Sequence, residues 1–327
     1  MTQKRVGVLG LGAYLPEKVL TNQDLEKMVD TSDEWIRTRT GIRERRIAEK
    51  GTATSDLAAK ASLEAIQSAG LKPTELDLII VATVSPDMIF PSTACIVQNK
   101  IGARCPAFDI SAACSGFPYA LTIGEGLIRS GSYKHILVIG AEVISGFINW
   151  KDRSTCVLFG DGAGAAVLGE AKDGHGILAT YLGADGAQAN LLHIPAGGSA
   201  TPPSAASVDA GLHFVQMEGS EVFKAAVRTM GDAIIEVIKR AGISLDDIHC
   251  LIPHQANLRI LNAVSERTGI PLEKIFINLD RYGNMSAAST PVALYEAVKN
   301  GHIKKNTNVV LVAFGSGLTW AACAIRW

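Results

Sequence analysis

The sequence predicts an α/β protein made of two similar halves, and its length and internal repeats are the observations that predict it. At 327 residues the chain is about twice a common domain length. Residues 65–81 resemble residues 237–253, and residues 128–139 resemble residues 298–312. Both matches are offset by about half the chain, which indicates a duplication. We therefore expect one half to span residues 1–173 and the other to span residues 174–327.

Helix and strand signals alternate within each half, which favours sheets covered by helices. After a first strand near residues 6–10, a helix is expected to end at residues 69–70, where an Ala-Gly pair terminates it. The apolar run 76–84 then predicts a strand that is buried on both faces. The second half repeats this order up to residue 253. A polar turn at residues 171–174 separates the halves, and the Gly-, Pro- and Ser-rich stretch 196–211 predicts a surface loop.

The charge and composition exclude several classes of protein. Lys and Arg total 31 against 32 Asp and Glu, and this balance predicts neither nucleic-acid binding nor attraction to a membrane surface. Apolar residues make up 47% of the chain, which excludes a disordered protein. No signal segment is recognised before the first strand, and the run 76–84 is shorter than the roughly 20 residues of a membrane span. Six cysteines without C-x-x-C spacing are typical of a reduced compartment, so we expect a cytoplasmic location.

Cys114 is the first candidate for a catalytic residue. Small residues flank it, and a helix-like stretch follows, so a substrate can approach and the helix start favours the thiolate. The alternative is a small buried apolar residue, which is the usual fate of a free cysteine. Adding 170 to 114 gives Asn284, which also precedes a helix-like stretch. We expect the two helix starts to correspond and to face one another.

His254 is the second candidate, because it directly follows a predicted buried strand, where loops commonly present catalytic groups. A structural histidine is the more frequent alternative, but none of the other six histidines has comparable surroundings. Three other motifs are rejected. The glycines at 10–12 lack the third glycine of a dinucleotide site, the glycine run 160–164 precedes a strand without Gly-Lys-Ser/Thr, and G-x-S-x-G is absent. With no metal-ligand spacing either, we expect neither a metal nor a nicotinamide cofactor.

Several stretches of the chain together resemble β-ketoacyl-acyl-carrier-protein synthase III, the condensing enzyme that starts bacterial type II fatty-acid synthesis. The resemblance runs from Val6 to Trp327 and rests on residues 31–36, 39–45, 109–116, 159–165, 253–257 and 283–284. It implies a thiolase-like fold, in which duplicated α/β halves with mixed sheets form five αβαβα layers. It also implies a homodimer. Met285, where threonine is common, and Ser316, in a loop that is usually all glycine, depart from the family pattern.

The resemblance also implies roles for individual residues. It implies a catalytic set of Cys114, His254 and Asn284, and an oxyanion site made by the backbone N–H groups of Cys114 and Ser316. Coenzyme A would contact Trp35, Arg39, Arg153 and Asn257. The acyl pocket would be limited by Ile144, Phe159 and Phe90, the last reaching across the dimer. The acyl carrier protein would contact Lys224, Arg259 and Arg267, for which an ordinary solvated surface is the alternative.

The implied activity is an acyltransferase reaction with coenzyme A thioesters as substrates and no further cofactor. Cys114 would take a short acyl group from acyl-coenzyme A, and decarboxylating malonyl-acyl-carrier protein would extend it, releasing CO2 and coenzyme A. The alternative within this class is an acyltransferase or starter ketosynthase of secondary metabolism. A catalytically silent carrier-binding subunit and a cysteine hydrolase are the alternatives from other classes. The starter acyl group stays open, because one methylene is worth only about 1–3 kcal/mol of discrimination.

Overall fold

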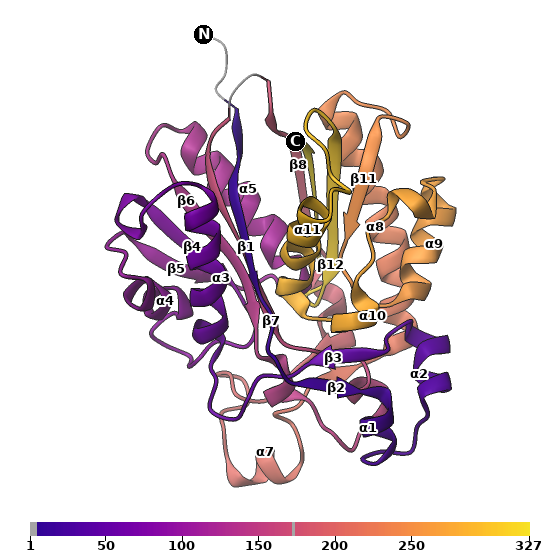
Figure 1. Ribbon diagram of the computed structural model, residues 1–327. Coiled ribbons are helices and arrows are strands. Elements are labelled where there is room, and N and C mark those ends of the chain that lie inside the picture. The colour runs from indigo at the N-terminus through magenta and orange to yellow at the C-terminus, as the bar shows by residue number, and fades with distance from the viewer. Residues whose placement is uncertain (1–4, 172–173) are drawn as a thin grey trace.

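Two mixed β-sheets alternate with three layers of helices in the computed structural model, which describes residues 5–171 and 174–327 (Figure 1). The first outer layer contains α3 (Thr54–Ser68) and α4 (Thr93–Ile101). The central layer between the sheets contains α5 (Gly116–Arg129) and α11 (Ser289–Lys299). The second outer layer contains α8 (Gly219–Ala241) and α9 (Leu258–Thr268). This is the predicted five-layer arrangement.

The two sheets have related strand orders. The first sheet has the order β1 (Val6–Tyr14), β7 (Gly162–Glu170), β6 (Ile136–Glu142), β4 (Leu78–Ala82) and β5 (Ala107–Ile110). The second has the order β8 (Gly176–Ala184), β13 (Thr319–Arg326), β12 (Asn308–Gly315) and β11 (Ile248–Pro253). In each sheet the first pairs are antiparallel, and the pairs β6–β4 and β12–β11 are parallel. Where β5 stands in the first sheet, the second has a single parallel bridge between Leu251 and Ile275.

Each sheet draws its strands from one half of the sequence, residues 6–170 for the first and 176–326 for the second. The predicted boundary at residue 173 falls on residues 172–173, which lie outside the described residues, so the position of the boundary stays a prediction. The central layer buries the largest apolar cluster, in which Ile80 and Phe117 of the first half pack with Leu294 and Leu311 of the second. The halves therefore share a core.

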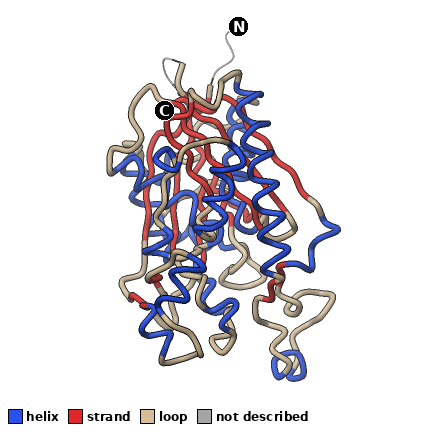
Figure 2. The backbone as a smooth tube through the Cα atoms, turned by 90° about the vertical axis from the view of Figure 1, so that its right-hand side faces the viewer, coloured by secondary structure: helices blue, strands red, loops and turns tan. Residues whose placement is uncertain are grey.

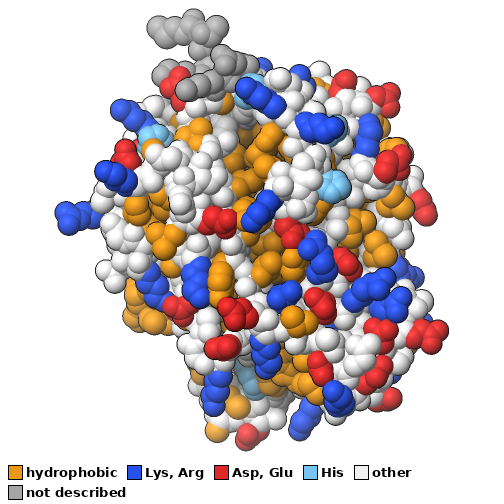
Figure 3. Space-filling model, in the orientation of Figure 1, with side chains coloured by type: hydrophobic (Ala, Val, Ile, Leu, Met, Phe, Trp, Pro, Cys, Tyr) orange, Lys and Arg blue, Asp and Glu red, His pale blue; other side chains and the backbone are white. Residues whose placement is uncertain are grey.

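Shorter elements complete the chain around one end of the sheets. They are α1 (Asn22–Glu26), α2 (Asp33–Thr40), α6 (Arg153–Cys156), α7 (Ala205–Asp209), α10 (Leu279–Tyr282), and the strand pairs β2 (Val19–Thr21) with β3 (Glu44–Arg46) and β9 (Leu192–His193) with β10 (Gln216–Met217). The predicted surface loop 196–211 projects from this end and carries the short helix α7, which the sequence analysis missed (Figure 2). Basic and acidic side chains are intermixed over the face shown in Figure 3, as the balanced charge of the sequence suggests.

The starts of the two central helices meet at the middle of the molecule. Each is preceded by a 3-10 turn, η2 (Ala113–Ser115) before α5 and η6 (Ser286–Ala288) before α11. The predicted facing of the helix starts is confirmed, because the Cys114 Sγ atom lies 3.6 Å from Ser286 Oγ. The predicted correspondence is wrong by three residues. The offset here is 173 rather than 170, so Ala287 corresponds to Cys114, and Asn284 precedes it.

The packing of η6 on strand β6 requires a glycine at position 140. A Cβ atom there would lie 2.2 Å from the carbonyl oxygen of Ala287, which is backbone and cannot turn away. Gly126, within α5, is exposed, and apart from the backbone of its own helix a Cβ there would have no neighbour within 4 Å among the described residues.

We expect Gly140→Ala to lower the free energy of unfolding by roughly 2–3 kcal/mol, because the turn η6 must move to accommodate the methyl group. Gly126→Ala serves as the matched control and should raise stability by up to about 1 kcal/mol, since alanine favours a helix interior. Urea unfolding of both variants measures the difference. Equal midpoints for Gly140→Ala and the parent chain would show that the packing at η6 is looser than described.

Candidate active site

Two cavities meet at Cys114. The first has a volume of about 330 Å³ and extends from Trp35 and Arg39 of α2 to the Cys114 side chain. The second has a volume of about 280 Å³ and is lined mainly by apolar side chains such as Val84, Ile144 and Val215. Cys114 and Phe159 line both cavities. A molecule in which an apolar chain is joined to a polar carrier would therefore place the bond between the two parts at the sulfur atom.

Cys114 is held in η2 by close backbone packing. A Cβ on Gly315 would lie 2.6 Å from the Cys114 amide nitrogen, so the end of β12 reaches the turn only because it is glycine. The first N–H groups of a helix have no intrahelical acceptor, which leaves the Cys114 N–H available to a ligand. Burial raises the pKa of the Cys114 thiol to about 12. The expected stabilisation of the thiolate by the helix start is therefore outweighed by desolvation, and the free chain carries the thiol.

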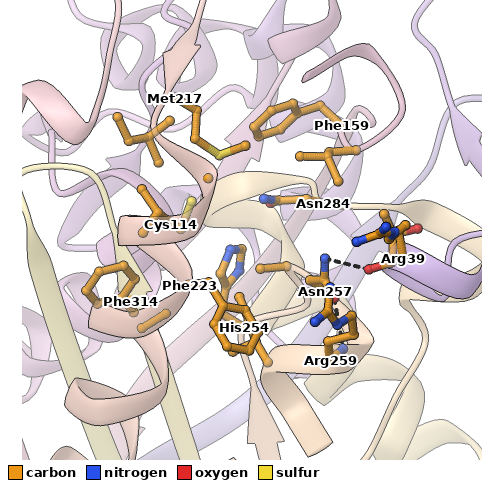
Figure 4. A pocket seen from close by; sticks show the side chains of 18 of the residues that line it. Arg39, Cys114, Phe159, Met217, Phe223, His254, Asn257, Arg259, Asn284 and Phe314 are labelled. Atoms are coloured by element: carbon orange, nitrogen blue, oxygen red, sulfur yellow. Dashed lines mark hydrogen bonds between the residues drawn. The ribbon is translucent and has the colours of Figure 1, made fainter. Parts of the chain in front are cut away.

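Asn284 is fixed by both its backbone and its side chain. Its N–H donates to the Leu158 carbonyl at 2.8 Å, and its carbonyl accepts from the Gly160 N–H at 3.0 Å. Its side-chain Oδ1 accepts from the Ser286 N–H at 2.8 Å. Because Oδ1 is engaged in this way, the Nδ2 group is the one presented to the first cavity, where Figure 4 shows it near Cys114 and His254.

His254 follows β11 and is anchored on the neighbouring strand, because its N–H donates to the Val312 carbonyl at 2.7 Å. The next side chain, Gln255, donates to the carbonyls of Pro253 and Phe276 and so fixes the turn. The His254 ring is buried, and its Nδ1 atom has no hydrogen-bond partner among the described residues. Burial lowers the pKa of His254 to about 3, so the ring is neutral at physiological pH.

The structure thus brings Cys114, His254 and Asn284 together on the wall of one cavity (Figure 4). The arrangement combines a nucleophilic sulfur with an imidazole and an amide, both of which are neutral hydrogen-bond donors. Neutral donors directed at a developing oxyanion stabilise it without adding an acidic proton to the site. The site suits reactions in which negative charge forms on a thioester oxygen.

Most of the residues expected to contact coenzyme A lie at the mouth of the first cavity. Trp35, Arg39 and Asn257 line it, and the Asn257 Nδ2 group donates to the Arg39 carbonyl at 3.1 Å (Figure 4). Arg153 does not line the cavity, but its guanidinium lies 4.9 Å from the centre of the Trp35 ring. Arg259 also lines the mouth, with its guanidinium over Phe223.

The other predicted residues are distributed around these cavities. Ile144, Phe159 and Ser316 line the second cavity, next to Cys114. Phe90 lines neither cavity and is 83% exposed, so it limits no acyl pocket within its own chain. Lys224 and Arg267, the other two residues expected to contact the acyl carrier protein, lie outside both cavities. Each forms an exposed ion pair, Lys224 with Glu221 and Arg267 with Asp232.

Sequence analysis missed the part of the first cavity's apolar wall that comes from α8. Val222, Ala226 and Met230 line it at a spacing of four residues, together with Phe223. That spacing is also the pattern of any helix packed on a core, so it could not mark a cavity. Sequence analysis also missed Glu142, a fully buried carboxyl group close to Cys114.

Comparisons with known proteins agree with this geometry. Family models described as 3-oxoacyl-[acyl-carrier-protein (ACP)] synthase III and its C-terminal part match residues 108–186 and 238–327. The chain is 60% identical over 322 residues to the beta-ketoacyl-[acyl-carrier-protein] synthase III of Caldanaerobacter subterraneus subsp. tengcongensis, covering 98% of this chain and 97% of the relative. The corresponding Clostridioides difficile protein is 55% identical, with coverage of 99% and 98%. The crystal structure of 3-oxoacyl-[acyl-carrier-protein] synthase III from Aquifex aeolicus VF5 superimposes with a TM-score of 0.92 at 50% identity, with coverage of 98% and 100%.

The fold and the site together define a condensing acyltransferase with the thiolase-like fold. The chain belongs to the β-ketoacyl-[acyl-carrier-protein] synthase III family. Its activity is therefore the condensation of acyl groups in fatty-acid biosynthesis.

The neutral, buried state of His254 predicts a pH dependence of stability. Below about pH 6.5 the unfolded chain takes up a proton at this histidine, whereas the folded chain does so only near pH 3, so His254 lowers stability as the pH falls between these values. Between pH 7 and pH 5 the parent chain should lose about 2 kcal/mol more than His254→Gln. Urea unfolding at both pH values measures this, with His249→Gln as the control for an exposed histidine. Parallel losses in parent and His254→Gln would mean that the ring is solvated or charged.

Proposed function

We propose that Cys114 carries the acyl group between two half-reactions, with His254 and Asn284 assisting the second. The observation that supports this is the position of the sulfur where the two cavities meet, because an acyl thioester has its reactive carbonyl between an apolar chain and a polar carrier. The acyl chain of a short acyl-coenzyme A occupies the second cavity, and the carrier occupies the first. The experiment on the two half-reactions described below tests this assignment.

In the first half-reaction the Cys114 sulfur attacks the thioester carbonyl. Because the thiol is protonated in the free chain, its proton leaves the sulfur as the new C–S bond forms. The coenzyme A thiolate is released as the old C–S bond breaks, and it takes up that proton. The N–H groups of Cys114 and Ser316 hold the negative oxygen of the tetrahedral intermediate in this proposal.

In the second half-reaction a malonyl thioester on the acyl carrier protein enters the first cavity. Loss of CO2 leaves an enolate, and its oxygen accepts hydrogen bonds from His254 and Asn284. By comparison with oxyanion-hole deletions each donor is worth roughly 2.7–4 kcal/mol. The enolate carbon attacks the acyl group on Cys114, and the sulfur leaves as a thiolate that takes up a proton from water. The product is a β-ketoacyl group on the carrier protein.

Charge at the mouth of the first cavity supports binding of both carriers. The guanidinium groups of Arg39 and Arg153 suit the phosphates of coenzyme A, since arginine forms two parallel hydrogen bonds to such groups. Lys224, Arg259 and Arg267 would meet the acidic carrier protein. The ion pairs of Lys224 and Arg267 are exposed and worth at most about 1 kcal/mol each, so they exchange readily for a partner's carboxylates.

The proposed roles make separable predictions for the half-reactions. Cys114→Ser should gain no acyl mass from acyl-coenzyme A, whereas Cys95→Ser, at an exposed cysteine, should still gain it. Asn284→Ala should acylate normally but decarboxylate malonyl-carrier protein about 10²–10³-fold more slowly, because one oxyanion donor is lost. Mass spectrometry of the protein and release of labelled CO2 measure the two steps. An Asn284→Ala variant that loses both steps equally would contradict the division of roles.

A homodimer is part of the proposal, and the edge of the first sheet supports it. β5 is the last strand of that sheet, and its Phe108 is partly exposed. Ile89 and Phe90 are 77% and 83% exposed, and the adjoining start of α4 is tied to β5 because the Thr93 and Ala94 N–H groups donate to Asp109. An open edge strand beside exposed apolar side chains favours pairing with a second copy. Phe90 would then enter the partner's second cavity.

Analytical ultracentrifugation tests this assembly. The parent chain should sediment with twice its mass of 34.5 kDa. Phe90→Asp should weaken the dimer, because it places a charge in an apolar interface, while Leu272→Asp, at an exposed apolar residue of the other half, should not. A parent chain that sediments as a monomer at micromolar concentration would exclude the dimer.

The location of the protein in the cell is expected from its cysteine usage alone. In the part of the chain that the structure describes, no helix has both the length and the hydropathy that a membrane span needs. The cytoplasmic location suggested by the sequence stays a prediction.

A further inference from the structure

Glu142 is a buried carboxyl group that neither half-reaction uses. It ends β6, beneath the meeting point of the two helix starts, and has no exposed surface. The loop after β4 surrounds it. The Val84 N–H donates to both carboxylate oxygens at 3.2 Å, and the Ser85 N–H donates at 3.1 Å. The hydroxyl groups of Thr83 and Ser85 also donate to it.

These partners favour the ionised form of Glu142. Backbone N–H groups can only donate, and the Ala287 N–H of η6 approaches the same carboxylate at 3.5 Å. A protonated carboxyl would direct its own O–H into this set of donors. Burial raises the pKa of Glu142, and the hydrogen bonds from Ser85, Val84, Ser286 and Thr83 oppose that rise. The surroundings are therefore those of a carboxylate held by converging donors.

Ser286 connects this carboxylate to the reactive residues. Its hydroxyl accepts a hydrogen bond from the Cys114 thiol at 3.6 Å and also interacts with Glu142. Its N–H donates to Asn284. Ser286 has a φ angle of 47°, which a residue other than glycine adopts only when its surroundings impose it. The Glu142 contacts to η6 are part of those surroundings.

Glu142 and Ser286 act on the Cys114 thiol in opposite directions. The negative charge of Glu142 raises the pKa of Cys114, and the Ser286 hydrogen bond lowers it, although burial is the larger cause of the rise. The other titratable groups on the two cavities that Cys114 lines are His254, Arg39 and Arg259 on the first and His193 on the second. His254 is neutral, and the two arginines belong to the cavity mouth.

We propose that Glu142 is a positioning residue of this site: it holds the turn η6 against the loop after β4, and its buried charge opposes ionisation of the Cys114 thiol, while the Ser286 hydroxyl directs the sulfur. The sulfur then ionises only as its proton leaves during attack on a thioester. A resting thiol is less reactive toward oxidants and alkylating agents than a thiolate. This inference rests on the proposed function only in naming Cys114 as the nucleophile.

Alkylation of Cys114 by iodoacetamide, followed by peptide mass spectrometry from pH 6 to 10, tests the inference without any substrate. Glu142→Gln has nearly the same size but no charge, so Cys114 should alkylate about tenfold faster at a given pH below its midpoint. Ser286→Ala removes the hydrogen bond, so Cys114 should alkylate more slowly. Glu142→Asp keeps the charge and should restore the parent profile. A general loosening of the fold would move all three variants in one direction.

Two controls accompany the measurement. Cys95 is exposed, and its alkylation in the same samples should be equal in every variant. Asp161→Asn alters another fully buried carboxylate, which is held by Ser145 and Ala48 rather than by the Cys114 turn, and should leave the Cys114 profile unchanged. An unchanged profile in Glu142→Gln, or the same change in Asp161→Asn, would overturn the inference. Acyl transfer measured separately on the parent chain tests the proposed function, so the two can fail independently.

Discussion

The contact between the two helix starts is the constraint on which the site depends. The turns η2 and η6 come from different halves, and each packs on a strand of the other half so closely that Gly140, beneath η6, and Gly315, beside η2, have no room for a side chain. This contact sets the distance from the Cys114 sulfur to Ser286, and Ser286 in turn orients the Asn284 amide. The geometry of the site is therefore a consequence of how the duplicated halves pack, and not of either half alone.

Burial shifts the pKa values of Cys114 and His254 in opposite directions, and both shifts favour the uncharged form of the side chain. It raises the pKa of Cys114 to about 12 and lowers that of His254 to about 3. Both shifts stabilise the neutral thiol and imidazole over a thiolate–imidazolium pair. Charge then develops only when a thioester is present to receive the sulfur. In the proposed second half-reaction the same low polarity would strengthen the hydrogen bonds from His254 and Asn284 to the enolate, so the condition that suppresses early ionisation would also assist the condensation.

The sequence predicted the α/β halves, their duplication and the residues around the cavities, because these follow from local periodicity and from specific motifs. It did not predict Glu142, which ends an apolar strand run and shows no local sign of its partners. Those partners lie far away in sequence: Thr83 and Ser85 after another strand, and Ala287 in the other half. The position of Asn284 relative to Cys114 was misjudged for a similar reason, since a short insertion changes the offset without altering either local pattern.

The selection of the acyl group and the condensation share a structural element. Phe159 lines the second cavity, and its neighbours Leu158 and Gly160 form the bridge that fixes the Asn284 backbone. A side chain of different volume at position 159 must either fit the existing cavity or displace this bridge, because well-packed walls transmit such changes rather than absorb them. Displacement would move the Asn284 amide, which is the proposed donor to the enolate. A change of preferred starter at this wall therefore acts on the second half-reaction as well as on the first, whereas a change at Val215, outside the bridge, acts on acyl binding alone.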